Sequence, residues 1–258
     1  MGPSARPKLY VISGSHACRT GMLMLEHKGI DYRRVVLPTG PHGLLVRLRG
    51  FPGHRTPIRQ VDGGTHRMLA MLDRAGTVPA LRYGDHRVQR NYEIARFLER
   101  ELPEPPLFPP DMEHRTAVEE AEAWGDEAFQ MAARRIVLAA AAHGLDALHN
   151  RGSRGRLGPL LATNEPMRVF ASGGARFSFR ANPGNEAKLL EELGPMLDRI
   201  DGWIEAGVLN TEQLNVADYV IAPSIALLTY RPELRAQIAA RPVGALVDRV
   251  VPDDPRDA

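Results

Sequence analysis

The first forty residues alternate between short apolar stretches and polar turns. Residues 8–12 (KLYVI) predict a strand that ends at the polar turn 13–19 (SGSHACR). Residues 20–29 then place apolar side chains on one face of a helix, and residues 30–37 predict a second strand. This order puts Ser15 at a helix N-terminus, where free N–H groups and the positive end of the helix dipole favour an anion such as a thiolate.

The following segments continue the mixed pattern. Residues 44–48 predict a short helix, and residues 65–75 predict another. Residues 77–83 and 87–89 predict two strands joined by a turn, and residues 91–101 predict a helix with one apolar face. The element order is therefore β-α-β-(α)-β-β-α.

A proline-rich run, 103–110, separates this pattern from a helical one. Its five prolines exclude both a helix and a central strand. Three later segments have the helical period: 113–143, 186–206 and 216–229. Pro195 predicts a kink in the second of them. Asn215 and Asp218 have the spacing of a capping box at the start of the third, which is apolar nearly all round and expected to be buried.

Composition narrows the class of protein. With 258 residues and 43% hydrophobic side chains, the chain can bury sizeable cores. Its single cysteine excludes an internal disulfide and any metal site built from several thiolates. No apolar run has the length of a membrane span, and the first residues lack the apolar core of a signal peptide. We therefore expect a cytoplasmic protein with no membrane partner and no bound metal.

Charge is divided unevenly along the chain. Through Leu102, 17 Lys and Arg residues stand against 8 Asp and Glu residues, a net charge of +9, whereas the remainder has 16 against 23, a net charge of −7. The basic part favours an anionic ligand there, or a counter-charged surface facing the acidic part. Nucleic acid is not an expected partner, because the arginines are scattered, aromatic residues make up only 6%, and no nucleic-acid-binding motif is present.

Four short stretches together resemble the glutathione transferase superfamily in their order and spacing. They are Ser15-His16-Ala17-Cys18, Thr77-Val78-Pro79, residues 88–98 (VQRNYEIARFL) and residues 214–219 (LNVADY). The resemblance covers most of residues 8–242. It implies an α/β thioredoxin-like, glutathione-binding domain (8–102), a linker (103–112) and an all-α helical domain (113–251). It also implies a homodimer.

The resemblance implies that Ser15 is catalytic. A hydroxyl at this position donates a hydrogen bond to the sulfur of glutathione and favours the thiolate, which attacks an electrophile. A simple N-cap is the alternative role of Ser15, and Ser13 is the next candidate for the hydroxyl. Among the implied glutathione-binding residues, Cys18 is expected one turn into the helix as a packed thiol. His16 either orients a ligand or is a solvated turn residue.

Pro79 carries much of the binding geometry that the resemblance implies. A cis Val78–Pro79 bond would present the backbone of Val78 to the cysteinyl part of glutathione; the alternative is an ordinary trans proline at an edge strand. Two residues depart from the family. Arg90 and Asn91 stand where an acidic or amide residue and a serine read the γ-glutamyl group. Arg90 repels an ammonium group but can pair with a carboxylate, and Asn91 can cap the helix or donate.

The expected function is that of a glutathione transferase-like enzyme, with glutathione as co-substrate and an apolar electrophile as second substrate. Candidates for the second-substrate pocket, with core packing as the alternative for the first three, are Met22, Trp124, Phe129, Met131 and Arg135. The segment 54–75 makes the separation of Ser15 and Pro79 long and is expected to rebuild or cover the cleft. Two alternatives remain open: a binding or regulatory protein that has lost glutathione, and a transferase for another small thiol.

Overall fold

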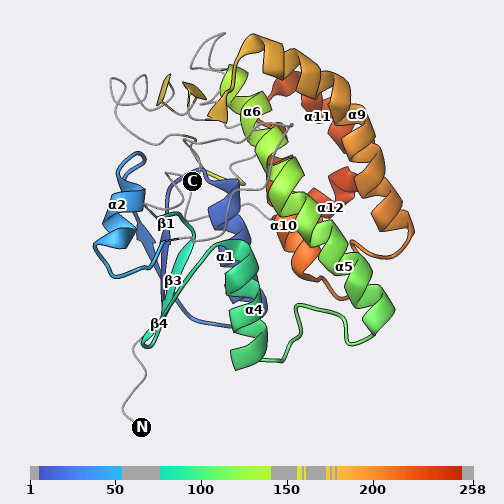
Figure 1. Cartoon of the computed structure of the whole chain (residues 1–258). Helices are drawn as coiled ribbons and strands as arrows, with labels where there is room; N and C mark the ends of the chain where they lie inside the picture. The colour runs from blue at the N-terminus through green and yellow to red at the C-terminus, as the bar shows by residue number, and fades with distance from the viewer. Residues whose placement is uncertain are drawn as a thin grey trace.

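The computed structural model describes residues 6–53, 76–140 and 179–251, together with 156–158, 160, 173–174 and 176–177. The helix predicted over 65–75 and the last residues of the helix predicted over 113–143 lie outside these residues. Figure 1 shows the small sheet on one side of the molecule and the later helices on the other, with the first helix between them.

Four short strands form one mixed sheet in the order β2-β1-β3-β4. They are β1 (Lys8–Val11), β2 (Arg33–Val36), β3 (Ala80–Tyr83) and β4 (His86–Gln89). β1 is parallel to β2, and β3 is antiparallel to both of its neighbours. β2 and β3 are shorter than predicted. Since proline has no N–H to donate, β3 begins only after Pro79, and β2 ends shortly before Pro38.

Three helices belong to the sheet-containing part: α1 (His16–His27), α2 (His42–Arg47) and α4 (Asn91–Glu101). α1 and α4 pack against each other and against β1 and β4, respectively. α4 has the predicted bounds. α1 begins at His16, within the turn predicted over 13–19 and before the predicted helix start at residue 20, because Ser15 caps it there.

The segment predicted as one helix over 113–143 is divided. α5 (Met112–Trp124) passes into a π-helical segment, η1 (Gly125–Phe129), and then into α6 (Gln130–Ala140). The widened turn occurs where the chain touches α10 (Val216–Leu228): a Cβ added to Gly125 would lie 2.9 Å from Cγ1 of Ile221. Glycine therefore permits the close approach, and the apolar period of the sequence does not show the extra residue in the turn.

α10 is buried along its whole length. Its predicted capping box is confirmed, with Asn215 and Asp218 each accepting from backbone N–H groups. α9 (Pro183–Glu205) contains Pro195, and two further helices, α11 (Pro232–Ala239) and α12 (Pro242–Val250), complete the described chain. No described helix combines the length and the apolar character needed to cross a membrane.

The sheet-containing part and the helical part share one hydrophobic core. α1 lies directly against α10, and α10 also packs on α5, α6 and α12. An ion pair joins the two parts. The two terminal nitrogens of Arg96 on α4 each donate a hydrogen bond to one carboxylate oxygen of Glu122 on α5, at 2.5 and 2.7 Å. Glu122 is only 1% exposed, so this pair fixes α4 against α5 in a buried setting.

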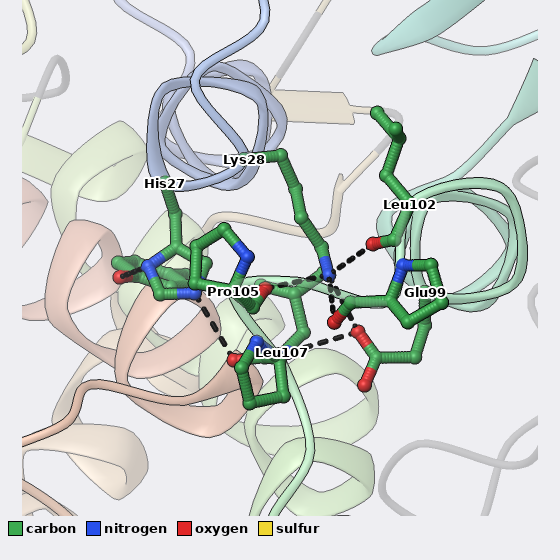
Figure 2. Close-up of polar contacts among 9 residues, drawn as sticks. His27, Lys28, Glu99, Leu102, Pro105 and Leu107 are labelled. Atoms are coloured by element: carbon green, nitrogen blue, oxygen red, sulfur yellow. Dashed lines mark hydrogen bonds and ion pairs between the residues drawn. The ribbon is translucent and has the colours of Figure 1, made fainter.

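The proline-rich linker is held by a buried lysine (Figure 2). The three N–H groups of the Lys28 ammonium, at the end of α1, are shared among four acceptors: a carboxylate oxygen of Glu99 at 2.7 Å and the carbonyl oxygens of Leu102, Pro103 and Pro105. The same Glu99 oxygen accepts from the backbone N–H of Leu107 at 2.9 Å. One ammonium group thus binds α1 to α4 and to the start of the linker.

His27, next to this lysine, ties the linker to α10 (Figure 2). Its Nε2 lies 3.0 Å from the carbonyl oxygen of Pro106 and therefore donates, which leaves Nδ1 to accept from the hydroxyl of Tyr219 at 2.9 Å. Burial lowers the pKa of His27, and the two contacts fit its neutral form.

Candidate active site

Ser15 lies at the N-terminus of the first helix, as predicted, and its side chain caps that helix. The chain turns after β1 through Gly14, whose φ of 68° is readily reached by glycine. The Oγ of Ser15 accepts from the backbone N–H of Cys18 at 3.2 Å. No acidic residue occupies the first turn of α1 to offset the positive end of its dipole. The hydroxyl oxygen is held in place, and its hydrogen can be donated either to the neighbouring Cys18 thiol or to a ligand in its place.

The sheet brings Ser15 to the same edge as the other predicted residues. Because β3 is antiparallel to β1 and β4, the end of β1, the start of β3 and the end of β4 lie side by side. Ser15 follows the first of these ends, the Val78–Pro79 pair precedes the second, and Arg90 follows the third. The predicted cis bond between Val78 and Pro79 is present, and the N–H of Arg90 donates to the carbonyl of Pro79 at 3.2 Å.

α1 lies tightly against this edge. A Cβ added to Gly21 would be 3.2 Å from the Cβ of Pro79, so a larger residue would displace the helix or the proline. Asn91 is 3% exposed and donates its amide N–H to the carbonyl of Ala17 at 3.0 Å. Its side chain is turned into α1 and does not cap α4, whose N-cap is Arg90. The capping role that the sequence left open for Asn91 is therefore not observed, because its amide group is directed to the carbonyl of Ala17 on α1.

A pocket of about 50 Å³ lies against Ser15, on the β2 side of α1. Among the described residues its walls are Val11, Ile12, Ser13, Gly14, Ser15, Cys18, Arg19, Met22, Arg34, Val36 and Leu157. Two serines, two arginines and several apolar residues contribute to these walls. Its volume suits one small chemical group beside the Ser15 hydroxyl.

Cys18 and His16 are both buried, at 2% and 4% exposure. Burial raises the pKa of the Cys18 thiol to about 11, so the residue is an uncharged thiol at neutral pH. Burial, together with the nearby charge of Arg134, lowers the pKa of His16 well below its usual range. His16 is therefore a neutral buried residue, and the expectation of a solvated turn histidine is wrong: as the first residue of α1 it faces the interior.

The charge of Arg90 is opposed by an acid from the helical part. The guanidinium of Arg90 lies 3.9 Å from a carboxylate oxygen of Asp126, in the π-helical segment. Burial raises the pKa of Asp126, and Arg90 and Arg134 act in the opposite direction. Arg90 is a non-glycine residue with a φ of 69°, a conformation that such residues seldom adopt. The charge of the residue expected to meet the γ-glutamyl group is thus partly compensated by Asp126.

Most residues predicted for the second-substrate pocket lie elsewhere. Among the described walls of the pocket at Ser15, only Met22 is one of the five. Trp124 stacks on the fully buried Phe129 with ring centroids 5.2 Å apart, and Arg135 is 4% exposed and donates to the carbonyl of Phe179. Met131, on α6, is partly buried. Trp124 and Phe129 pack on each other within the helical part, a role that apolar periodicity cannot separate from ligand contact.

Sequence reasoning missed Arg19 and Arg34, which line the pocket. A lone arginine in a sequence is normally taken for a surface residue. One signal was available: Arg33 and Arg34 are adjacent in a predicted strand, so their side chains must point to opposite faces. Arg34 pairs with the fully buried Leu9 and faces the side of the sheet covered by α1, whereas Arg33 is exposed.

No protein-family model and no curated protein matches this sequence. Among solved structures, the chain is similar to a glutathione S-transferase of Ceriporiopsis subvermispora in complex with glutathione, at 15% identity and a TM-score of 0.61, with 96% of this chain and 98% of that chain covered. It is also similar to the beta-etherase LigF of Sphingobium sp. strain SYK-6, at 16% identity and a TM-score of 0.55, with 95% and 98% covered.

A third similar structure is a glutathione S-transferase of Methylobacterium radiotolerans in complex with glutathione sulfonate, at 18% identity and a TM-score of 0.54, with 95% of this chain and 90% of that chain covered. At sequence identities this low, the similarity shows a shared fold and not a shared activity. The chain has the glutathione S-transferase fold, an α/β thioredoxin-like unit followed by an all-α helical unit, which confirms the predicted fold class. Within the described residues, no group of three or more His, Cys, Asp or Glu side chains is placed to hold a metal ion.

Proposed function

We propose that the protein joins glutathione to an electrophilic second substrate, with Ser15 activating the thiol. The observation that carries this proposal is the position of the Ser15 hydroxyl: it stands at the N-terminus of the 12-residue helix α1, lines a pocket, and shares a sheet edge with the cis Val78–Pro79 pair. The glutathione and glutathione sulfonate named for two structures of the same fold support the choice of thiol.

The chemistry follows from the cap geometry. The N–H of Cys18 fixes the Ser15 oxygen, so the hydroxyl donates its hydrogen to the glutathione sulfur. That hydrogen bond and the positive end of α1 both favour the thiolate, and the thiol proton leaves to solvent. The thiolate then forms a carbon–sulfur bond with the electrophile as its leaving group departs. The backbone of Val78 holds the cysteinyl part, and Arg90 takes a carboxylate of glutathione.

The test separates catalysis from capping by two substitutions at one position. Ser15→Ala removes both the cap and the hydroxyl, whereas Ser15→Asp keeps a good cap but puts a carboxylate beside the sulfur. We expect both variants to lose roughly ten- to a hundredfold in turnover of 2-chloroacetamide, a small uncharged electrophile, with glutathione, and the loss should be largest below about pH 8.5, where the free thiol is protonated. Only Ser15→Ala should also lose about 1 kcal/mol of stability.

Ser13→Ala is the matched control, since Ser13 lines the same pocket from the turn. Unchanged activity and pH profile in Ser15→Asp would mean that Ser15 serves only as a cap. A larger loss in Ser13→Ala than in Ser15→Ala would transfer the role to Ser13.

The second candidate function is a binding or regulatory protein that has lost glutathione. It is favoured by Asn91, whose amide group is engaged by α1, and by Arg90, which faces Asp126. Retention on a glutathione column and a shift of the thermal unfolding midpoint by glutathione distinguish the two functions. A homodimer, implied by the family resemblance, and a cytoplasmic location, expected from the composition of the sequence, complete the proposal.

A further inference from the structure

Two arginines, Arg19 and Arg34, line the pocket beside Ser15. Arg19 comes from α1 and is 4% exposed, and Arg34 comes from β2 and is half-buried. Both have other interactions in the chain as well. A guanidinium group has five N–H donors, so one partner does not exhaust its capacity to bind an anion.

Other features of the pocket add to its positive potential. The hydroxyls of Ser13 and Ser15 can donate, and α1 directs its N-terminal end toward the same turn. None of the described residues that line the pocket is an aspartate or a glutamate. Such a site favours a group that carries negative charge and accepts several hydrogen bonds at once.

We propose that this pocket binds the carboxylate of an acidic second substrate, so that the protein acts on short electrophilic acids. This inference rests on the thiol transfer proposed above, and it replaces the expected apolar electrophile. A pocket of about 50 Å³ has room for a carboxylate. Arg19 and Arg34 bind the carboxylate, and the apolar side chains of Met22 and Val36 contact the adjoining carbon atoms.

The placement also sets where the reaction occurs. Because Ser15 belongs to the same pocket, an electrophilic carbon one or two bonds from the bound carboxylate lies next to the sulfur that Ser15 activates. With a 2-chloro acid, the sulfur forms a bond to C2, the carbon–chlorine bond breaks, and chloride leaves with the bonding electrons. The thiol proton goes to solvent, and the product is a thioether acid.

The test compares 2-chloroacetate with 2-chloroacetamide, which have nearly the same size and differ in charge. Rates with glutathione are corrected for the uncatalysed reaction, and the readout is the acid-to-amide ratio of kcat/KM. We expect Arg34→Met to lower this ratio at least tenfold and Arg34→Lys to restore part of it. Arg33→Met is the matched control, because Arg33 is the neighbouring residue of β2, is itself exposed, and points to the opposite face of the sheet.

A separate binding measurement distinguishes failure of this inference from failure of the proposed function. Saturation-transfer NMR without glutathione, at constant ionic strength, should show 2-chloroacetate binding to the native protein and not to Arg34→Met. Binding of the acid without any turnover would reject the thiol transfer and keep the pocket assignment. Turnover with a ratio that is the same in native protein, Arg33→Met and Arg34→Met would overturn the pocket assignment. Circular dichroism of each variant verifies that it is folded.

Discussion

Arg90 combines three constraints at one residue of the candidate site. Its φ is 69°, its N–H donates to the carbonyl of Pro79, and its guanidinium faces Asp126 at 3.9 Å. The backbone bond fixes the start of α4 relative to Pro79, and the carboxylate of Asp126 offsets the charge of the arginine. The remaining donors of Arg90 suit a carboxylate of glutathione better than its ammonium group.

We predict that Arg90→Met raises KM for glutathione roughly ten- to a hundredfold and changes kcat much less. The loss corresponds to a charge-assisted hydrogen bond, about 1.5–3 kcal/mol, made to bound glutathione before and during reaction. Steady-state kinetics at varied glutathione concentration measures it. Arg100→Met, on the exposed face of the same helix, should leave KM unchanged. A KM for Arg90→Met equal to that of Arg100→Met would remove Arg90 from the glutathione site.

Single residues were predictable where one physical rule decides their position. The position of Ser15 at the start of α1 was predicted because a serine between a strand and a helix typically caps the helix. The cis bond before Pro79 was predicted because the position of Pro79 in the strand pattern matched the family. Arg19 and Arg34 were missed, since which face of an element becomes a pocket wall depends on contacts between segments far apart in the sequence. Asn91 was placed correctly at the start of α4, but its role depended on how closely α1 approaches.

Among the elements, α10 depends most on its N-terminal cap. The side chain of Asn215 accepts from the N–H of Ala217 and donates to the carbonyl of Val208, both at 2.9 Å. Asp218 accepts from the N–H groups of Asn215 and Asn210. Burial raises the pKa of Asp218 to about 6. The two N–H groups therefore donate hydrogen bonds to a carboxyl group that lies deep in the core. The box joins the preceding loop to the central helix.

We predict that Asn215→Ala costs clearly more stability than the same substitution at Asn182, the N-cap of α9. Asn182 is exposed, so its loss should cost about 1 kcal/mol. Asn215 is 4% exposed, and its loss leaves the Ala217 N–H and the Val208 carbonyl unpaired in the interior, which adds roughly 1–3 kcal/mol. Urea unfolding of the two variants measures the difference. Equal losses would show that water reaches both caps.

The boundaries of elements were predicted best where caps and prolines mark them. The bounds of α4 and α10 were predicted to within a residue, because both have a polar start and because α4 has a regular apolar face while α10 is apolar nearly all round. α11 and α12 were not predicted as separate helices, because each is too short to show a clear apolar period. Each begins with a proline, Pro232 or Pro242, which is compatible with the first position of a helix but also with a loop. The π-helical segment has no sequence period of its own; it depends on how Gly125 packs against Ile221.

On the scale of the whole molecule, the relation between the sheet and the helices depends on the linker. Its proline content predicted an extended connection, but nothing in the sequence indicated that Lys28 would hold it. The partners of Lys28 are mostly backbone carbonyl groups, which every residue has and no sequence pattern distinguishes. A lysine near a helix C-terminus is ordinarily explained by the helix dipole.

We predict that Lys28→Met destabilises the protein by roughly 3 kcal/mol and exposes the linker to proteases. The Lys28 side chain is fully buried and binds Glu99 and three carbonyl oxygens, so its removal leaves a carboxylate and several acceptors without their donor. Lys188→Met is the matched control: Lys188 forms an exposed pair with Glu192 at 3.6 Å, and its loss should stay within about 0.5 kcal/mol. Urea unfolding gives the stabilities, and limited proteolysis shows whether cleavage within 103–110 increases. If Lys28→Met unfolds at the same urea concentration as Lys188→Met and its linker stays intact, the lysine does not hold the two parts together, and the shared core around α1 and α10 does so alone.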